Sequence, residues 1–443
     1  MAPDAGRIGM GGSDERTAYV NARLIDPATD LDLSGALLSV NGKIADLGPR
    51  LFTDGVPEGT AVVDCLGNCL TPGLIDMRVH LREPGEEHKE TIASATQAAA
   101  AGGITSIVCL PNTRPAIDDV ALIEFIARRA RETGVVKIYS YAAITRGCEG
   151  DELTEMGILA EAGALAFTDG IRAVRDTLVM RRALSYASTY GLLIVQHPEE
   201  PALARGGTMN EGEVATRLGL PTIPAAAEVM MVERDLRLVE LTGARYHVAH
   251  VSTAAAIEAI RRAKTQGLPV TCDTAPQYFT LNETAVGDYR TFAKLSPPLR
   301  SEDDRCAVVE GLKDGVIDVI ASDHTPQDQD SKRLPFGQAE NGIVGLETLL
   351  PLSLALHHRG EIGLLDLLAK LTAHPAKILA MDEGRLAVGA PADLAVIDLD
   401  RPWRIEPDSF ISKSKNSPFD GHPVQGAAAV TVVGRRTVFA GQS

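Results

Sequence analysis

Long hydrophobic runs are missing from this chain of 443 residues, whose apolar stretches are only as long as β-strands. A transmembrane helix needs about 20 consecutive apolar residues, so none is predicted. The first 16 residues, MAPDAGRIGMGGSDER, lack the apolar centre of a secretory signal peptide. We therefore expect residues 1–16 to form a flexible tail and the protein to be cytoplasmic, with no membrane contact.

Positive charge is also scarce, because 43 Lys and Arg residues face 59 Asp and Glu residues and give a formal net charge of −16. Nucleic-acid-binding proteins normally present a basic face, so this balance argues against a nucleic-acid partner. No GxGxxG or GxxxxGK[ST] motif opens any predicted helix, so a nucleotide-binding fold lacks its signal. A local cationic pocket for a small anionic substrate stays compatible with the overall acidity.

Cysteines are few, and the six that occur are scattered. Only Cys65 and Cys69 lie close together, and no second pair completes a zinc ribbon. Scattered cysteines of this kind are typical of reduced thiols in a cytosolic protein.

The sequence does contain a regular alternation of apolar strands and helical segments. Eight candidate strands span residues 74–80, 104–110, 137–143, 164–169, 192–197, 245–250, 269–274 and 317–323. Helical patterns fill most intervals between them, and glycines such as Gly134 and Gly191 close several of these helices. Such alternation builds a parallel sheet, and eight units in about 300 residues match a closed (β/α)8 barrel of the TIM type. A doubly wound open sheet is the alternative.

The two ends of the chain differ from this middle. Residues 17–70 and 385–443 contain short strands and turns, and Asn41-Gly42 is a hairpin signal. We expect these two β-rich ends to form one composite β-sandwich domain beside a barrel of residues 71–384.

Polar residues cluster where the predicted strands end. These residues are His80, Asn112, Asp169, His197, His250 and Asp323. In a barrel the C-terminal ends of all strands meet around one mouth, so residues far apart in sequence would converge there. Three imidazoles and two carboxylates form a ligand set suited to zinc or a similar ion. Taken singly, a strand-end histidine is more often structural, and an aspartate there often caps the next helix.

The stretch PGLIDMRVHLREPG, residues 72–85, complicates the metal hypothesis. Side chains alternate along a strand, which places Asp76, Arg78, His80 and Arg82 on one side. Two histidines at i and i+2 on a strand end can bind one ion, but here Arg78 occupies the first of these places. Arginine has no lone pair to donate to a metal.

These motifs, in this order, resemble the class I dihydroorotases of the amidohydrolase superfamily. The matching segments are PGLIDMRVHLREPG, CLPNTRP, GALAFTDG, IVQHPEE, YHVAHVST, PPLRSEDDR, VIASDHTP, IVGLETLLP and GRLAVGAPADLAVIDLD. The resemblance covers about residues 18–440. It implies a barrel with a β-sandwich and the reversible conversion of N-carbamoyl-L-aspartate to L-dihydroorotate in de novo pyrimidine (UMP) biosynthesis.

The resemblance also implies roles for individual residues. Metal ligands would be His80, Asp169, His197, His250 and Asp323. Asp323 would also act as the catalytic acid and base. Substrate would contact Arg82, Asn112, Ser296, Gln327, Phe336 and Gly337. Among these, Arg82 and Asn112 would clamp the substrate's α-carboxylate, since a guanidinium fork matches a carboxylate in two parallel bonds.

Three positions depart from the family's pattern. Arg78 stands in place of a ligand histidine, Gln327 in place of a substrate-contacting histidine, and Ser296 in place of an asparagine. Two unit charges about 4 Å apart repel by about 4 kcal/mol at an effective dielectric constant of 20, so Arg78 should weaken the first metal position. Of one or two zinc ions, one is therefore favoured. Three arrangements stay open: a single-metal site, a site in which the guanidinium replaces the charge of the first ion by pairing with Asp323 or Asp169, and an inactive site.

The same departures leave three functions open. The protein is an active dihydroorotase, a non-catalytic dihydroorotase-like subunit that scaffolds aspartate carbamoyltransferase, or a cyclic amidase acting on a hydantoin, allantoin or dihydropyrimidine. A homo-oligomer is expected in each case.

Overall fold

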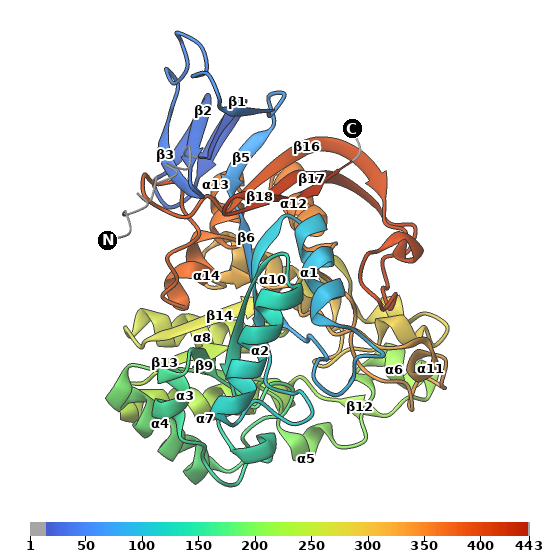
Figure 1. Cartoon of the computed structure of the whole chain (residues 1–443). Coiled ribbons are helices and arrows are strands. Elements are labelled where there is room, and N and C mark those ends of the chain that lie inside the picture. Colours follow the sequence, from blue (N-terminus) through green and yellow to red (C-terminus); the bar gives the residue numbers. More distant parts are fainter. Residues whose placement is uncertain (1–14, 442–443) are drawn as a thin grey trace, which may run out of the picture.

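The computed structural model describes residues 15–441, and its centre is a barrel of eight parallel strands (Figure 1). The strands are β6 (Leu74–Val79), β7 (Ile104–Cys109), β8 (Lys137–Ala142), β9 (Ala164–Phe167), β10 (Leu193–Gln196), β13 (Arg245–Val248), β14 (Val270–Thr274) and β15 (Val319–Ile320). They are hydrogen-bonded in this order. A parallel bridge between Val79 and His324 joins the first strand to the last. The predicted (β/α)8 barrel is confirmed.

Most barrel strands end one to three residues before the predicted ends. Backbone conformation explains two of these differences, because His250 has φ 36° and Asp323 has φ 52°. A residue in the left-handed region cannot continue a strand ladder. The polar side chains expected at the strand tips consequently lie on the residues that turn away from the barrel wall.

Helices follow most of the barrel strands. The longer ones are α1 (Ile92–Ala101), α2 (Val120–Thr133), α4 (Thr177–Tyr190), α7 (Ala226–Thr242), α8 (Ala254–Thr265), α10 (Glu302–Lys313) and α12 (Leu349–His358). The shorter ones are α3 (Met156–Glu161), α5 (Pro201–Ala204), α6 (Glu213–Leu218), α9 (Pro276–Thr280), α11 (Gln329–Lys332), α13 (Leu364–Ala369) and α14 (Ala373–Ile378). Side chains of Thr253 and Ser301 accept backbone N–H bonds at the starts of α8 and α10 and so fix where these helices begin.

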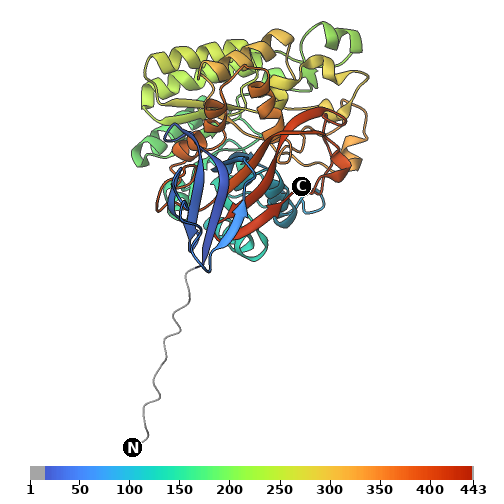
Figure 2. The same cartoon turned by 90° about the horizontal axis from the view of Figure 1, so that it is seen from above.

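Strands from both ends of the chain share one sheet. They are β1 (Arg16–Asp26), β2 (Leu31–Val40), β3 (Lys43–Gly48), β4 (Ala61–Asp64), β5 (Cys69–Pro72), β16 (Leu394–Arg404), β17 (Pro423–Val433) and β18 (Arg436–Ala440). The two ends meet where β5 pairs antiparallel with β16. Figure 2 shows the blue N-terminal strands beside the red C-terminal ones. The predicted tail lies outside the described residues except for its last two positions.

The C-terminal strands also bring a segment of chain to the barrel mouth. Thr431 on β17 donates to the carbonyl oxygen of Ala100 on α1 at 2.7 Å, which fixes the sheet against the barrel. Between β16 and β17 the chain passes through Ser412 and Asn416, and Ser412 donates to the buried carboxylate of Glu90. This segment therefore packs directly behind the loops that surround the strand ends.

Two further properties agree with the sequence analysis. No helix in residues 15–441 has the length and apolar character needed to cross a membrane. All six cysteines are free thiols, and only Cys306 is exposed.

Candidate active site

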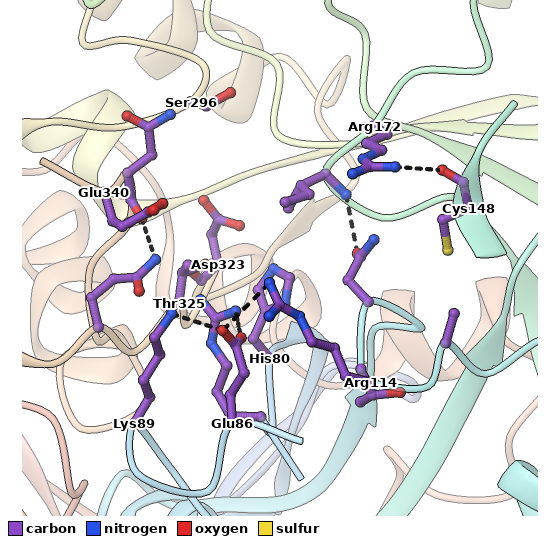
Figure 3. Close-up of a pocket in the computed structure, with 18 of the residues that line it drawn as sticks. His80, Glu86, Lys89, Arg114, Cys148, Arg172, Ser296, Asp323, Thr325 and Glu340 are labelled. Carbon is purple, nitrogen blue, oxygen red and sulfur yellow. Dashed lines mark hydrogen bonds and ion pairs between the residues drawn. The ribbon is translucent and has the colours of Figure 1, made fainter. Parts of the chain in front are cut away.

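A cavity of about 570 Å3 opens at the C-terminal ends of the barrel strands. Figure 3 shows His80 and Asp323 near its centre. Around them it shows Glu86 and Lys89, from the loop after β6, and Ser296, from the chain after β14. The barrel thus brings residues from both ends of the sequence to one cavity, as the strand-end pattern predicts.

Arg78 and Asp323 form a buried ion pair beside His80. Arg78 Nε donates to Asp323 Oδ1 at 2.9 Å, and the two side chains are only 3% and 10% exposed. Asp76 holds the strands that carry this pair, because its Oδ1 accepts the backbone N–H groups of Arg78 and Ser322. Burial raises the pKa of the Asp323 carboxyl, and the charge of Arg78 acts in the opposite direction. A guanidinium therefore occupies the place of the expected first metal ligand and neutralises Asp323.

His197 and His250 face each other beneath the cavity. His197 Nδ1 lies 2.9 Å from His250 Nε2, and the rings stack with centroids 4.9 Å apart. His80 Nε2 and His250 Nδ1 are buried without a hydrogen-bond partner among the described residues. Burial lowers the pKa of both His80 and His250 well below the usual range, and nearby positive groups lower it further. These imidazoles are consequently neutral at pH 7, the form that can bind a metal ion.

Asp169 is buried close to this region but is engaged elsewhere. Its carboxylate accepts the backbone N–H of Thr145 at 2.9 Å and also the Thr145 hydroxyl. Burial raises the pKa of Asp169 to about 6, although the bonds from Thr145 oppose that shift. Its carbonyl oxygen accepts from Asn112 Nδ2 at 3.0 Å. The carboxylate expected to complete a metal site is therefore turned toward Thr145.

The cavity floor has residue types that could bind one cation, namely His197 and His250, but among the described residues it lacks a second set of ligands. Within residues 15–441, no group of three or more His, Cys, Asp and Glu side chains is placed to hold a metal ion. His197 Nδ1 and His250 Nε2 lie 2.9 Å apart in a mutual hydrogen bond, and a cation would have to replace the shared proton to bind both nitrogens. On the other side, Arg78 pairs with Asp323 and places a guanidinium where a second cation would need ligands.

Arg82 is the candidate for anion recognition, and part of its fork is already used. Its Nη1 donates to Glu86 Oε2 at 2.8 Å, and its Nε donates to the Pro326 carbonyl oxygen at 3.1 Å. Lys89 Nζ donates to the other Glu86 oxygen at 2.9 Å. Burial opposes ionisation of Glu86, but Lys89 and Arg82 together hold its pKa below the usual value. An internal carboxylate thus lies on the two cations that could bind a substrate carboxylate.

Asn112 lines the same cavity and is held in one orientation. Its Oδ1 accepts the backbone N–H of Ile171 at 3.1 Å, while its Nδ2 reaches the Asp169 carbonyl oxygen. The side chain lies directly over Gly170, where an added Cβ would come within 1.4 Å of Asn112 Oδ1. Gly170 is therefore required both for this close approach and for its φ of 66°.

The remaining predicted contacts divide into two groups. Ser296 and Gln327 line the cavity. Ser296 Oγ lies 3.4 Å from His197 Nε2, and Gln327 Nε2 donates to the Asn341 carbonyl oxygen at 2.8 Å. Gln327 Oε1 is buried without a partner among the described residues.

Phe336 and Gly337 lie outside the cavity lining. Phe336 is 3% exposed and packs in a hydrophobic cluster, and the Gly337 carbonyl oxygen accepts from Lys294 Nζ. The same loop instead reaches the cavity through Glu340, Asn341 and Gly342. The predicted contacts Phe336 and Gly337 therefore do not line the cavity, whereas residues a few positions later in the same loop do.

Three residues at the site have left-handed backbone conformations that only glycine adopts easily. Arg82 has φ 60°, His250 has φ 36° and Asp323 has φ 52°. Each such residue costs about 1–3 kcal/mol, and such strain concentrates at functional sites. Strain at three predicted site residues supports a functional cavity.

Several residues at the site escaped sequence reasoning. Glu199 lines the cavity, with one carboxylate oxygen 3.8 Å from His197 Nε2, and its only signal was its place two residues after His197. Glu86 carried a weaker signal, four residues after Arg82. Asn416 had none, since it donates to the Thr325 carbonyl oxygen from 91 residues away in sequence.

Comparison with known sequences is consistent across the chain. Residues 67–256 match the model of the Dihydro-orotase-like family. The chain is 51% identical over 430 residues to a dihydroorotase from Wolbachia sp. subsp. Drosophila simulans, covering 97% of this chain and 96% of that protein. It is 48% identical over 417 residues to a dihydroorotase from Geobacter metallireducens, covering 94% and 98%.

Solved structures share the fold over nearly the same length. The L-hydantoinase (dihydropyrimidinase) from Arthrobacter aurescens superposes with a TM-score of 0.87 at 26% identity, covering 97% of this chain and 96% of that one. A dihydropyrimidinase from Brevibacillus agri has a TM-score of 0.83 at 24% identity, with coverages of 96% and 95%, and supports the fold alone.

Proposed function

The chain belongs to the dihydroorotase family of the amidohydrolase superfamily, and from that premise we propose that it interconverts N-carbamoyl-L-aspartate and L-dihydroorotate in pyrimidine biosynthesis. The observation that carries this proposal is 51% identity to a dihydroorotase over 97% of the chain. The aligned residues include the whole barrel and the loops around the cavity. At the coarser level of reaction class, the chain is a cyclic amidohydrolase.

Substrate binding is assigned first to Arg82. Its Nη2 donates to no described residue in residues 15–441, and Arg82 lines the cavity, so this nitrogen is available to a substrate carboxylate. Lys89 adds a second positive charge on the same side. One N–H of the Asn112 amide remains after its bond to Asp169, and it can donate to the same anion.

Proton transfer is assigned to Asp323. In ring opening, a water oxygen bonds to the ring carbonyl carbon and the bond from that carbon to nitrogen breaks. One water proton finishes on the released nitrogen, and the other leaves the new carboxylic acid. Asp323 takes the first proton from water and gives it to the nitrogen, a role favoured by the raised pKa of this buried carboxyl. Biosynthesis runs these steps in reverse.

One zinc ion completes the proposal. His197 and His250 would hold it in place of the hydrogen bond between their nitrogens, and Asp169 would join them only by giving up its bonds to Thr145. His80 and Asp323, also expected as ligands, lie on the side that Arg78 occupies. When bound, such an ion supplies the Lewis acidity that amide hydrolysis needs.

A second function is favoured by one observation. The Arg78–Asp323 pair replaces a pair of metal ligands, which agrees with a non-catalytic subunit that scaffolds aspartate carbamoyltransferase. Action on a neutral hydantoin is disfavoured, because such a substrate has no carboxylate to accept from Arg82 Nη2, which Glu86 does not occupy. We also propose that the protein is cytoplasmic and forms a homo-oligomer. Light scattering of the purified protein tests the oligomeric state.

The deciding experiment follows hydrolysis of L-dihydroorotate by the purified protein and by Arg82→Met. A charge-assisted hydrogen bond contributes about 1.5–3 kcal/mol, so Arg82→Met should raise KM about 10- to 100-fold. Arg146→Met is the matched control, because Arg146 is exposed, pairs with Glu152 and does not line the cavity.

The outcomes separate the candidates. Turnover with the expected KM effect supports the dihydroorotase. A folded protein without turnover that co-purifies with aspartate carbamoyltransferase supports the scaffold. Turnover of a hydantoin but not of dihydroorotate would replace the substrate in the proposal.

A further inference from the structure

Arg78 is a buried cation whose terminal nitrogens have no hydrogen-bond partner among the described residues. Its backbone N–H donates to Asp76 and its Nε donates to Asp323, but neither Nη atom donates to any residue in the described range 15–441. The residue is only 2% exposed, yet it lines the cavity. A guanidinium has five N–H donors, so four of them remain for a molecule in the cavity.

The surroundings of Arg78 make it the fixed positive charge at the cavity floor. His80, two residues after Arg78, and Asp323 line the same cavity. Within residues 15–441, Asp323 is the one carboxylate paired with the guanidinium, and it fixes the plane of the guanidinium through Nε.

We propose that Arg78 is a catalytic residue that donates through its Nη atoms to the oxygen of the scissile ring carbonyl, and that it limits the site to one cation. The proposal rests on the dihydroorotase function given above. Negative charge develops on that oxygen when the water oxygen bonds to the carbonyl carbon. The electron pair then re-forms the carbonyl double bond as the carbon–nitrogen bond breaks. Fixed donors aimed at such an oxygen stabilise the transition state.

Ring opening conserves all protons without protonation or deprotonation of Arg78. The proton from water passes to the released nitrogen through Asp323, and Arg78 keeps all its protons throughout. Arginine suits this role, because its planar fork can hold Asp323 through one nitrogen while two others face the substrate. A single-ended lysine cannot do both at once.

An Arg78–Asp323 ion pair that only stabilises the fold would have the same geometry. Steady-state kinetics distinguish this structural role from the catalytic role. A structural role changes the fraction of folded protein and leaves kcat and KM of the folded enzyme alone. An oxyanion donor acts mainly on kcat, since its bond is strongest in the transition state. The test therefore compares kcat and KM for soluble, folded enzyme whose folding is checked by circular dichroism.

The first arm uses Arg78→Met and Arg78→Lys, with Arg146→Met as control. Arg78→Met should lower kcat about 10²- to 10³-fold, the usual loss for one oxyanion donor, with KM changed less than about threefold. Arg78→Lys should recover part of kcat, because it restores the charge without the fork. If Arg78→Met does not fold, Arg78→Lys decides the question alone, because it keeps a positive charge beside Asp323 but lacks the Nη donors, and its kcat should stay below that of wild type.

The second arm counts zinc by elemental analysis and does not need activity. The wild-type protein should bind at most one zinc per chain, and Arg78→His should bind up to one more. Two zinc ions in the wild type, or an unchanged count in Arg78→His, would overturn the limit to one cation. A kcat for folded Arg78→Met within threefold of wild type would overturn the catalytic role. An inactive wild type would instead refute the dihydroorotase function, and the zinc count would still decide the limit to one cation.

Discussion

The stability of the Arg78–Asp323 pair allows a quantitative prediction. Arg78→Met removes the cation and leaves the Asp323 carboxylate buried, with a side chain only 10% exposed. Breaking a buried ion pair from one side costs about 3–5 kcal/mol, because the remaining charge is neither solvated nor paired. Arg78→Met should therefore lower the free energy of unfolding by about that amount at pH 7.

The same prediction has a defined dependence on pH. Burial holds the pKa of folded Asp323 above its unfolded value, and removing Arg78 removes the influence that lowers it. A carboxyl whose folded pKa is raised contributes stability below the unfolded pKa and loses it as pH rises through the folded pKa. The deficit of Arg78→Met should consequently be small near pH 4 and grow toward neutral pH.

Urea denaturation followed by circular dichroism measures this effect. The double variant Arg78→Met with Asp323→Asn has no buried carboxylate, so it should regain at least about 2 kcal/mol at pH 7 and lose the dependence on pH. Equal stability of Arg78→Met and wild type at pH 7 would refute the reasoning. So would a double variant that is no more stable than Arg78→Met.

Three further changes test other parts of the site. Glu86→Gln removes the internal carboxylate from Arg82, so KM for dihydroorotate should fall several-fold in steady-state assays; an unchanged or higher KM would show that Glu86 does not compete with substrate. Gly170→Ala places a Cβ within 1.4 Å of Asn112 Oδ1 at a φ of 66°, and should lower stability by at least about 1 kcal/mol and raise KM; a wild-type melting curve and KM would contradict this. Asn416→Ala removes bonds to two loop carbonyl oxygens and one backbone N–H, so it should lower the free energy of unfolding by about 1–3 kcal/mol in urea denaturation. A decrease below about 0.5 kcal/mol, the size expected of an ordinary surface substitution, would contradict this.

The barrel was predictable because its signal is periodic and local. Strands β6 and β7 are buried at every position, so their apolar runs stand out in the sequence. The pairing of β5 with β16 joins segments more than 300 residues apart, and only similar composition at both ends pointed to it. Strand ends were less predictable, because His250 and Asp323 have positive φ, which few non-glycine residues adopt and which no sequence pattern marked here.

The sequence indicated which residues line the cavity better than it indicated which groups those residues bind. Arg82, His80, Asn112, Ser296, and Gln327 were chosen from motifs, and all line the cavity. That Thr145 would hold the Asp169 carboxylate depends on a loop geometry that no motif encodes.

The Arg78–Asp323 pair shows what sequence could and could not supply. The loss of a ligand at Arg78 was visible in the motif, because arginine cannot bind a metal. The sequence offered Asp323 or Asp169 as the partner of its guanidinium, and the choice of Asp323 depends on how β6 and the chain after β15 close the barrel. The same closure determines which of its nitrogens stay free.

The central claim is that this cavity opens and closes a cyclic amide with Asp323 as its proton carrier. Its most direct test is the rate of L-dihydroorotate ring opening by wild type and by Asp323→Asn, each supplied with zinc and shown to be folded. We predict turnover by the wild type and a loss of about 10²- to 10⁴-fold in the variant, the usual contribution of a general acid or base. A folded wild type with no turnover, or a variant as fast as wild type, would contradict the account.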